Sequence, residues 1–203
     1  MKKNIVLVFI LVFFSVIQSI NAQEFASEKA FEKTQPIREV KRNVIAANFG
    51  WKSLTGVGFT YHNYVHKQMA VDMGIGVALT GVKLGARYRY LFSPKNFSPY
   101  VSAGFNYGLG SGGVEIVSLD QGNFYKYTVG PSSFFQLAAG IEYLANKGFL
   151  FQFDVGYAFL LSGGDYEITE GTPNEQNRWA LDAQTGSGIV FEFTLGYAFG
   201  GGK

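Results

Sequence analysis

The 203-residue chain has no cysteine, only two histidines and five prolines, and just 16% charged residues. Without cysteine there is no disulfide scaffold, no thiolate metal site and no cysteine nucleophile. The formal net charge of +2 is too small and too scattered for a nucleic-acid-binding surface. Low charge together with 17% aromatic residues excludes an intrinsically disordered chain. The aromatic residues and the 26 glycines instead indicate a β protein with much apolar surface.

A long uninterrupted apolar run is found at the start of the chain, where Ile5–Phe14 follows Lys2 and Lys3. A more polar stretch then leads to Ala22, the predicted cleavage position. This pattern predicts a secretory signal peptide over residues 1–22. A membrane-anchor helix would need roughly 18 consecutive apolar residues, and polar side chains interrupt this run too early.

Residues 23–42 carry charges of both signs and few large apolar side chains, and Pro36 interrupts them. We expect a periplasmic N-terminal arm, partly helical or disordered. The folded domain is predicted over residues 43–203.

From Asn43 onwards, apolar residues recur at every second position, and no segment shows the 3.6-residue period of an amphipathic helix. The clearest case is Phe149–Ser162, followed by the last segment, 188–199. Each segment has about ten residues, the length that a tilted strand needs to cross a bilayer. Eight strands are predicted in this way, near 43–52, 56–65, 69–80, 82–91, 100–110, 134–144, 149–162 and 188–199.

Alternation alone does not say which row of side chains faces outward, because a lipocalin-like soluble barrel alternates too. Glycines decide the question: they lie in the more polar row of each strand and not in the apolar row. Small residues suit the crowded interior of an eight-stranded barrel. The apolar row, rich in Phe and Tyr, then faces lipid. The glycines of the inward row are Gly50, Gly56, Gly58, Gly74, Gly76, Gly85, Gly104, Gly108, Gly140, Gly156, Gly188 and Gly196.

The connections between these strands differ in length on the two sides of the predicted barrel. Three short turns lie on one side, and the long connections, about 111–132 and 163–187, lie on the other. The connections near Ser53–Leu54 and Thr80–Gly81, also on the long-loop side, are short. Outer-membrane barrels have short periplasmic turns and longer extracellular loops. The sequence therefore predicts an all-β, eight-stranded antiparallel up-and-down transmembrane β-barrel.

In strand number, signal peptide, loop asymmetry and its aromatic last strand (Phe191, Phe193, Leu195, Tyr197 and Phe199), the chain resembles the small eight-stranded outer-membrane β-barrels of diderm bacteria. This family includes the membrane domain of outer-membrane protein A and the protein X and W types. The resemblance implies a location in the outer membrane, contact with its lipid and lipopolysaccharide, and insertion by the barrel-assembly machinery. The last strand looks like the C-terminal assembly signal, except that 200–203 follow its final aromatic residue.

The predicted inward rows carry charged side chains of both signs. Burial of isolated charges is costly, so these groups are expected to pair. Pairing would make a salt-bridged plug, whereas the alternative is a narrow gated path that the same charges line. The residues are Asp72, Lys83, Arg87, Arg89, Glu142, Asp154 and Glu192.

Catalysis is not expected. The barrel resembles the architecture of outer-membrane lipid A deacylases, but its histidines, His62 and His66, both lie toward the periplasmic end of the second strand and the predicted outer loops contain none. Two histidines spaced four apart also give no recognisable metal site. No cofactor motif is present.

The long loops are the expected location of an interaction function, because binding residues concentrate on loops held by rigid scaffolds. Val114–Leu119 and Phe124–Val129 predict a projecting β-hairpin. The fourth loop is acidic and is either a hydrophilic cap or a docking surface for an extracellular protein or ligand, or for cation-bridged lipopolysaccharide. Its candidate residues are Asp165, Glu167, Glu170, Glu175, Trp179 and Asp182.

The function predicted from the sequence is therefore structural or interactive, with two long acidic extracellular loops. A narrow channel for small or apolar solutes is the alternative, and an outer-leaflet lipid-modifying enzyme is a more distant one.

Overall fold

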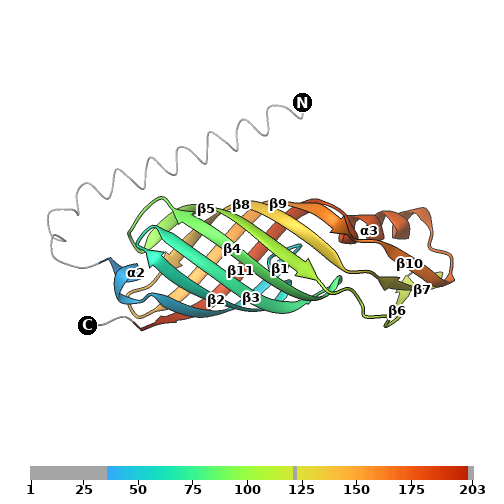
Figure 1. The fold of residues 1–203 in the computed structure, drawn as a ribbon, viewed down its shortest axis with the longest axis horizontal. Coiled ribbons are helices and arrows are strands. Elements are labelled where there is room, and N and C mark those ends of the chain that lie inside the picture. Colours follow the sequence, from blue (N-terminus) through green and yellow to red (C-terminus); the bar gives the residue numbers. More distant parts are fainter. Residues whose placement is uncertain (1–35, 121–122, 201–203) are drawn as a thin grey trace, which may run out of the picture. The chain divides into compact units, whose positions relative to one another are not determined.

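A computed structural model of the chain describes residues 36–120 and 123–200. The predicted signal peptide and most of the predicted N-terminal arm lie outside the described residues. A short helix, α2 (Ile37–Val40), precedes the first strand. Eight strands then form a closed barrel (Figure 1): β1 (Asn43–Trp51), β2 (Val57–His66), β3 (Met69–Ala78), β4 (Gly81–Leu91), β5 (Phe97–Gly108), β8 (Ser132–Leu144), β9 (Phe149–Gly163) and β11 (Gly188–Phe199).

Every neighbouring pair of strands in the barrel is antiparallel, and the strands follow one another in chain order around it. The last strand, β11, closes the barrel by pairing with β1, with Asn43 opposite Phe199 and Trp51 opposite Phe191. Closure gives each barrel strand two hydrogen-bonded neighbours, so the barrel has no free edge. The predicted up-and-down topology is confirmed.

Side chains alternate along the strands as the sequence pattern predicts. In β11, Phe191, Phe193 and Leu195 are exposed on the outside, while Glu192 and Thr194 between them are buried inside. The same alternation in the other strands gives the barrel wall an apolar outer surface. The alternative in which the apolar row forms a soluble core is therefore wrong.

The inward glycines let the barrel wall close tightly around its contents. A Cβ atom added at Gly156 would lie 2.2 Å from the Leu137 carbonyl oxygen, and one at Gly58 would lie 2.5 Å from the Gly76 Cα. No side chain fits at such distances. The narrow barrel interior thus depends on glycine in these rows.

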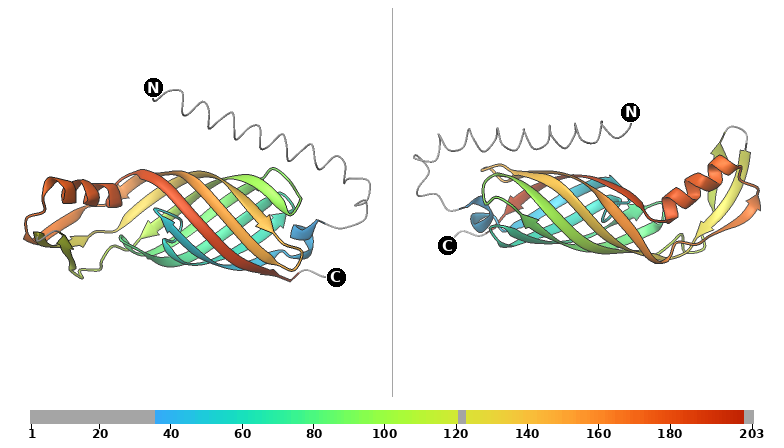
Figure 2. Two further views of the ribbon diagram at one scale, coloured as in Figure 1. Left: turned by 180° about the vertical axis from the view of Figure 1, so that it is seen from behind. Right: turned by 90° about the horizontal axis from the view of Figure 1, so that it is seen from above.

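The two long connections fold together at the end of the barrel opposite α2 (Figures 1 and 2). β6 (Ile116–Asp120) and β7 (Asn123–Val129) form the predicted hairpin, and β10 (Tyr166–Gly171) joins it in a three-stranded sheet of order β10-β7-β6. Helix α3 (Glu175–Thr185) follows in the second connection. We refer to β6, β7, β10 and α3 together as the outer module.

The prediction that no helix occurs after Asn43 is wrong, because α3 is helical. Its buried face is made by Asn177, Leu181 and Thr185, a four-residue spacing with a single large apolar residue. With one large apolar residue, this face gives the sequence no recognisable helical period of apolar residues. The N-cap residue Asn174 precedes the helix, and its side chain accepts a hydrogen bond from the Asn177 amide at 2.8 Å. In the described part of the chain, no helix has the length and apolar character needed to span a membrane.

Candidate functional site

A continuous chain of ion pairs runs through the barrel interior. Arg89 Nε and Arg87 Nε each donate to Asp72 Oδ2 at 2.7 Å. Arg89 also contacts Glu142 through Nη1. Arg87 Nη1 lies 3.1 Å from Asp154 Oδ2, and its Nη2 lies 2.9 Å from Glu192 Oε1. Six of the seven charged residues predicted to face inward are therefore brought together, and all six are buried.

Arg38, in α2, adds a further link that the sequence did not reveal. Its side chain is fully buried, and its Nε donates to Glu142 Oε1 at 2.8 Å. Its Nη1 donates to the carbonyl oxygens of Ser93 and Lys95, in the turn between β4 and β5. Helix α2, which precedes the barrel, is thus joined to the ion-pair chain. Because Arg38 is 104 positions from Glu142 in the sequence, no local pattern could have indicated this pair.

Neutral polar groups add hydrogen bonds to two of the buried carboxylates, Glu142 and Asp154. Tyr64 Oη donates to Glu142 Oε1 at 2.8 Å, and Gln152 Nε2 donates to Glu142 Oε2 at 2.7 Å. Tyr100 Oη donates to Asp154 Oδ2 at 2.6 Å. Buried charges are stable only when paired and hydrogen-bonded in this way.

His62 lies fully buried in the barrel interior, and its hydrogen bonds define its role. Arg89 Nη2 lies 3.0 Å from His62 Nδ1, and because an arginine only donates, Nδ1 accepts. His62 Nε2 then carries the proton and donates to Thr60 Oγ1 at 2.6 Å, while Thr60 donates to Asn48 Oδ1 at 2.8 Å. Asp72 lies beyond His62, with its Oδ1 3.5 Å from Nδ1. Thr60, His62 and Asp72 are arranged in the order of a catalytic triad. In a triad the histidine Nε2 accepts the hydroxyl proton, whereas here Nε2 donates to Thr60, so His62 does not act as a base toward Thr60.

The short connection between β1 and β2 folds into the barrel. Ser53, Leu54 and Thr55 are all fully buried. The Leu54 amide donates to Glu192 Oε2 at 2.9 Å, which joins this loop to the ion-pair chain. We call residues 52–56 the inward loop.

Glycines on the facing strands make room for the inward loop. A Cβ at Gly85 would lie 2.7 Å from the Leu54 side chain, and one at Gly74 would lie 2.5 Å from that of Thr55. The inward glycines thus have a second purpose besides narrowing the barrel. The sequence pattern showed these glycines but not the loop that they accommodate.

Lys83, the seventh predicted inward charge, is buried but lies apart from the ion-pair chain. Its Nζ donates to the Ser53 carbonyl oxygen at 2.7 Å. Lys52, which is not among the predicted inward charges, lies nearby, and its Nζ donates to the carbonyl oxygens of Gln184 and Gly186. Burial lowers the pKa of Lys52 to about 8.

Apolar side chains close the barrel interior at the α2 end. Val44, Leu91, Leu144 and Leu150 are fully buried there, and Ile37 of α2 packs against the same cluster. The interior is thus filled in three layers: an apolar layer with α2, the ion-pair chain, and the inward loop.

The outer module has a small apolar core of its own. Tyr125, Tyr127 and Val129 of β7 pack with Leu181 of α3, and Ile116, Tyr166 and Ile168 pack around them. This core explains why the two long connections fold as one unit.

The candidate outer-loop residues have different surroundings. Glu170 pairs with Lys126 of β7, and Asp182 accepts a hydrogen bond from Tyr166 Oη at 3.0 Å. These two residues therefore help hold the module together. Trp179 is 73% exposed, and Glu175 lies in the first turn of α3. Glu167 is exposed on β10, and Asp165 contributes its backbone oxygen to the Gly130 amide.

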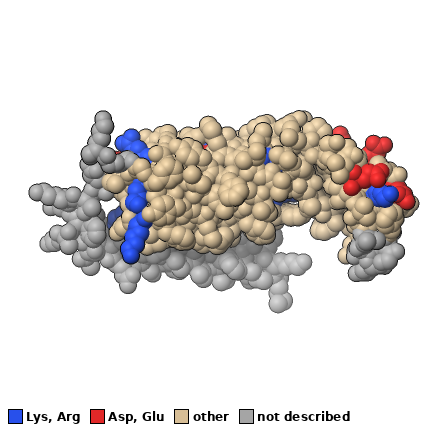
Figure 3. All heavy atoms as spheres, turned by 90° about the horizontal axis from the view of Figure 1, so that it is seen from below, with Lys and Arg blue, Asp and Glu red and all other residues tan. Residues whose placement is uncertain are grey.

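On the face seen in Figure 3, basic side chains gather at one end of the molecule and acidic side chains at the other. The charged side chains of the barrel strands are buried inside and leave the outer wall uncharged. At the α2 end lie Lys41, Arg42, Lys67, Lys95 and Lys147, on or next to the short turns. Acidic side chains predominate on the outer module at the other end. The wall between them presents Phe, Tyr, Leu, Ile, Val and Met side chains around its circumference.

An uncharged apolar wall on a closed barrel defines the class of protein: a transmembrane β-barrel of eight antiparallel strands. No protein-family model matches the sequence, and no curated protein matches it either. Among solved structures, the N-terminal β-barrel domain of Pseudomonas aeruginosa OprF is 12% identical, with a TM-score of 0.48 over 79% of this chain and 98% of that chain. Acinetobacter baumannii CarO is 8% identical, with a TM-score of 0.38 over 82% of this chain and 100% of that chain. The strand number, the up-and-down topology and the apolar outer surface of the barrel itself confirm the predicted resemblance to small eight-stranded outer-membrane barrels at the level of architecture.

Proposed function

We propose that the protein is an integral outer-membrane protein whose barrel is closed to solutes and holds the outer module at the cell surface for binding. The observation that carries this proposal is the ion-pair chain, which continues without a break from Arg38 in α2 to the Leu54 amide in the inward loop. The barrel is then a rigid support, and its exposed loops are the functional part.

The buried pairs argue against the alternative of a narrow channel. A solute moving through the interior would have to separate Arg87 and Arg89 from their carboxylates, and breaking one buried pair costs about 3–5 kcal/mol. It would also have to expel the inward loop and the apolar layer next to α2. A catalytic role has no support in the interior, because the histidine there, His62, donates to Thr60 and accepts from Arg89.

The charge distribution supports an orientation with the outer module outside the cell. Short turns and basic side chains occupy the α2 end, and the long connections occupy the other. Short turns are periplasmic in outer-membrane barrels. Basic side chains at that end would also lie beside the phosphates of inner-leaflet lipids.

The module offers a binding surface that is acidic and carries one large exposed aromatic residue, Trp179. Exposed aromatic residues are enriched at binding hot spots. Acidic side chains favour a basic protein partner or lipopolysaccharide bridged by divalent cations. Binding of purified lipopolysaccharide is measured with and without Mg²⁺, for wild type and for Trp179→Ala. Binding that requires Mg²⁺ would favour lipopolysaccharide over a basic protein partner.

The closed barrel is tested by single-channel recording of the purified protein in planar bilayers, with an open porin as positive control. We expect no resolved conductance steps from wild type. Insertion is checked by gel mobility, because a folded barrel runs compactly in SDS until it is heated. Reproducible steps from heat-modifiable protein would contradict the closed barrel and favour the channel.

A further inference from the structure

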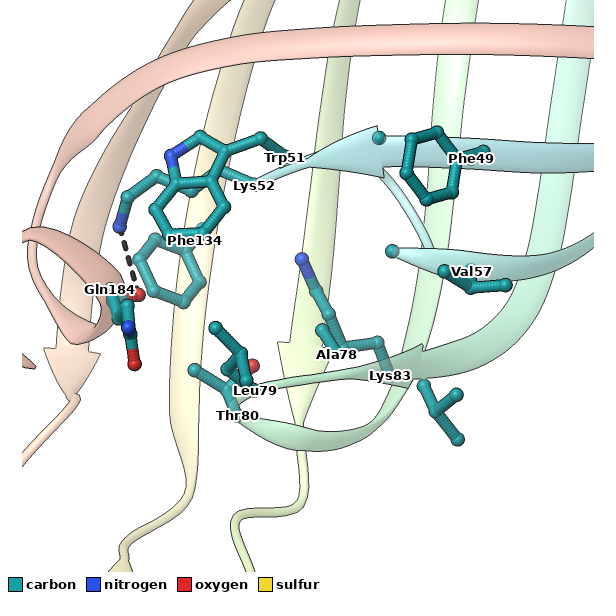
Figure 4. Close-up of a pocket in the computed structure, with 13 residues that line it drawn as sticks. Phe49, Trp51, Lys52, Val57, Ala78, Leu79, Thr80, Lys83, Phe134 and Gln184 are labelled. Atoms are coloured by element: carbon teal, nitrogen blue, oxygen red, sulfur yellow. Dashed lines mark hydrogen bonds between the residues drawn. The ribbon is translucent and has the colours of Figure 1, made fainter. Parts of the chain in front are cut away.

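A pocket of ≈ 430 Å³ opens at the long-loop end of the barrel, between the end of β1, the β3–β4 turn and α3 (Figure 4). Part of its lining faces outward from the barrel: Phe49 is 69% exposed and Val77 is 57% exposed. Another part faces the interior, since Lys83 and Phe134 are each 3% exposed. The pocket therefore joins the lipid-facing surface to the mouth of the barrel.

Two lysine ammonium groups lie near the Phe134 ring on the interior side of this pocket. The Nζ atoms of Lys52 and Lys83 lie 5.4 and 5.7 Å from the centre of the Phe134 ring. Their hydrogen bonds go to backbone carbonyl oxygens. Within residues 36–120 and 123–200, no carboxylate lies within 4 Å of either ammonium group, in contrast to the interior arginines.

The interior carboxylate on this side of the barrel is already occupied. Glu192 accepts from Asn48 and from the Leu54 amide, and it pairs with Arg87. The two lysines therefore place positive charge beside an apolar wall without a contacting anion. A partly buried cation in this situation gains from an anionic ligand, because its contacts are neutral carbonyl oxygens and the Glu192 carboxylate acts on Lys83 only from beyond 4 Å.

We propose that this pocket binds an amphiphile with one apolar chain and one anionic head group. The chain lies against Phe49, Val57, Val77 and Leu79, and the carboxylate or phosphate head contacts Lys52 and Lys83. A neutral apolar ligand would leave both cations without a contacting anion, and a small hydrophilic anion would leave the apolar wall uncovered. The volume and the mostly apolar lining are typical of small-ligand pockets. Two sources share this chemistry: a free alkyl carboxylate from outside the cell and an anionic lipid of the surrounding bilayer.

Trp51 supplies a built-in reporter, because it lines the pocket and the chain has only two tryptophans. In Trp179→Phe, Trp51 is the remaining indole, and bromine atoms on a bound chain quench its fluorescence. The experiment titrates this variant, in neutral-detergent micelles, with brominated dodecanoate and with its uncharged methyl ester. We expect saturable quenching by the carboxylate at concentrations about tenfold below those of the ester, the effect of one charged hydrogen bond.

Changes at the lysines distinguish the pocket from general uptake into the micelle. In the same background, Lys52→Met with Lys83→Met is expected to abolish the preference for the carboxylate. Lys147→Met, at the opposite end of the barrel, is expected to leave it intact. Each variant is first shown to migrate as a heat-modifiable barrel. If the double variant does not fold, Lys52→Met alone tests the proposal, because Lys52 lies outside the strands, and it is expected to weaken binding several-fold.

Equal quenching by carboxylate and ester, or a preference that survives the lysine changes, would overturn the proposal. A nanodisc arm then identifies the source, by comparing brominated anionic phospholipid with brominated zwitterionic phospholipid at equal mole fraction. Stronger quenching of Trp51 by the anionic lipid identifies a bilayer lipid as the occupant. Equal quenching there, with saturable dodecanoate binding in micelles, identifies a free amphiphile. The conductance test of the closed barrel is independent of both arms.

Discussion

Arg38 completes the charge balance of the interior, although it precedes the first strand. The buried carboxylates of Asp72, Glu142, Asp154 and Glu192 outnumber the three cations that lie on the strands, Lys83, Arg87 and Arg89. Arg38 supplies the fourth. A barrel without α2 would therefore keep an excess negative charge in its interior.

Replacement of Arg38 by alanine is expected to destabilise the barrel by about 3–5 kcal/mol, because Glu142 would keep its burial and lose a partner. The measurement is urea unfolding of the protein in lipid vesicles, followed by tryptophan fluorescence. Arg42→Ala is the matched control, since Arg42 is exposed and donates to the Glu39 carbonyl oxygen; a change within about 0.5 kcal/mol is expected there. Equal effects of the two changes would show that the Arg38–Glu142 pair does not account for the contribution of α2 to barrel stability.

Gly85 provides a test of the inward loop. A Cβ there would lie 2.7 Å from two atoms of the Leu54 side chain and 2.8 Å from its carbonyl oxygen. Gly85→Ala is therefore expected to destabilise the barrel by about 1–3 kcal/mol through overpacking. Combining it with Leu54→Ala should cost less than the sum of the two changes, because the small side chain relieves the clash. Gly130→Ala is the control, with its nearest neighbour at 3.4 Å. Additive effects of Gly85→Ala and Leu54→Ala would mean that the loop does not occupy the interior.

At the scale of elements, the strands and the helix differ in how much their sequences reveal. A barrel strand buries one row and exposes the other over ten or more residues, so β9 and β11 have long and unambiguous alternation. Helix α3 is stabilised by one large side chain, Leu181, against the β7 sheet, and by its cap. Its formation therefore depends on tertiary packing that the local sequence does not encode.

The site shows the same division. The inward charges of β3, β4, β8, β9 and β11 followed from the period of two. Arg38 and the inward loop did not, because neither belongs to a periodic segment. The inward loop turns at Lys52, which has a φ of 50°, an uncommon value for a residue other than glycine. Its position is determined by glycines on other strands, which lie well away from it in the sequence.

The cap of α3 is open to a direct test. Asn174→Ala removes the acceptor for the Asn177 amide and is expected to destabilise the helix by about 0.5–2 kcal/mol. Hydrogen exchange of the α3 amides, measured by mass spectrometry, should become faster while exchange in the barrel strands stays unchanged. Asn174→Asp keeps an acceptor at the cap and should retain protection. Unchanged exchange in Asn174→Ala would show that packing of Leu181 alone holds the helix.

At the scale of the whole molecule, the barrel and the outer module have separate cores. Tyr125, Tyr127, Val129 and Leu181 form the core of the module, whereas the barrel clusters involve strands β1 to β5, β8, β9 and β11. Lys52 of the inward loop is one link between them, through the carbonyl oxygens of Gln184 and Gly186. This division predicts that the barrel folds without the module.

Replacing residues 112–129 and 165–186 by short Gly-Ser turns removes the module and leaves every barrel strand pairing in place. We expect the shortened protein to insert into bilayers and to keep its heat-modifiable mobility in SDS. It should also remain non-conducting, because the ion-pair chain and the inward loop lie within the barrel. Binding of an extracellular partner should be lost, whereas loss of the Lys52 hydrogen bonds to Gln184 and Gly186 should leave the barrel interior filled. A shortened protein that runs unfolded would show that the module directs barrel assembly. One that folds but conducts would show that the module, and not the filled interior, closes the barrel.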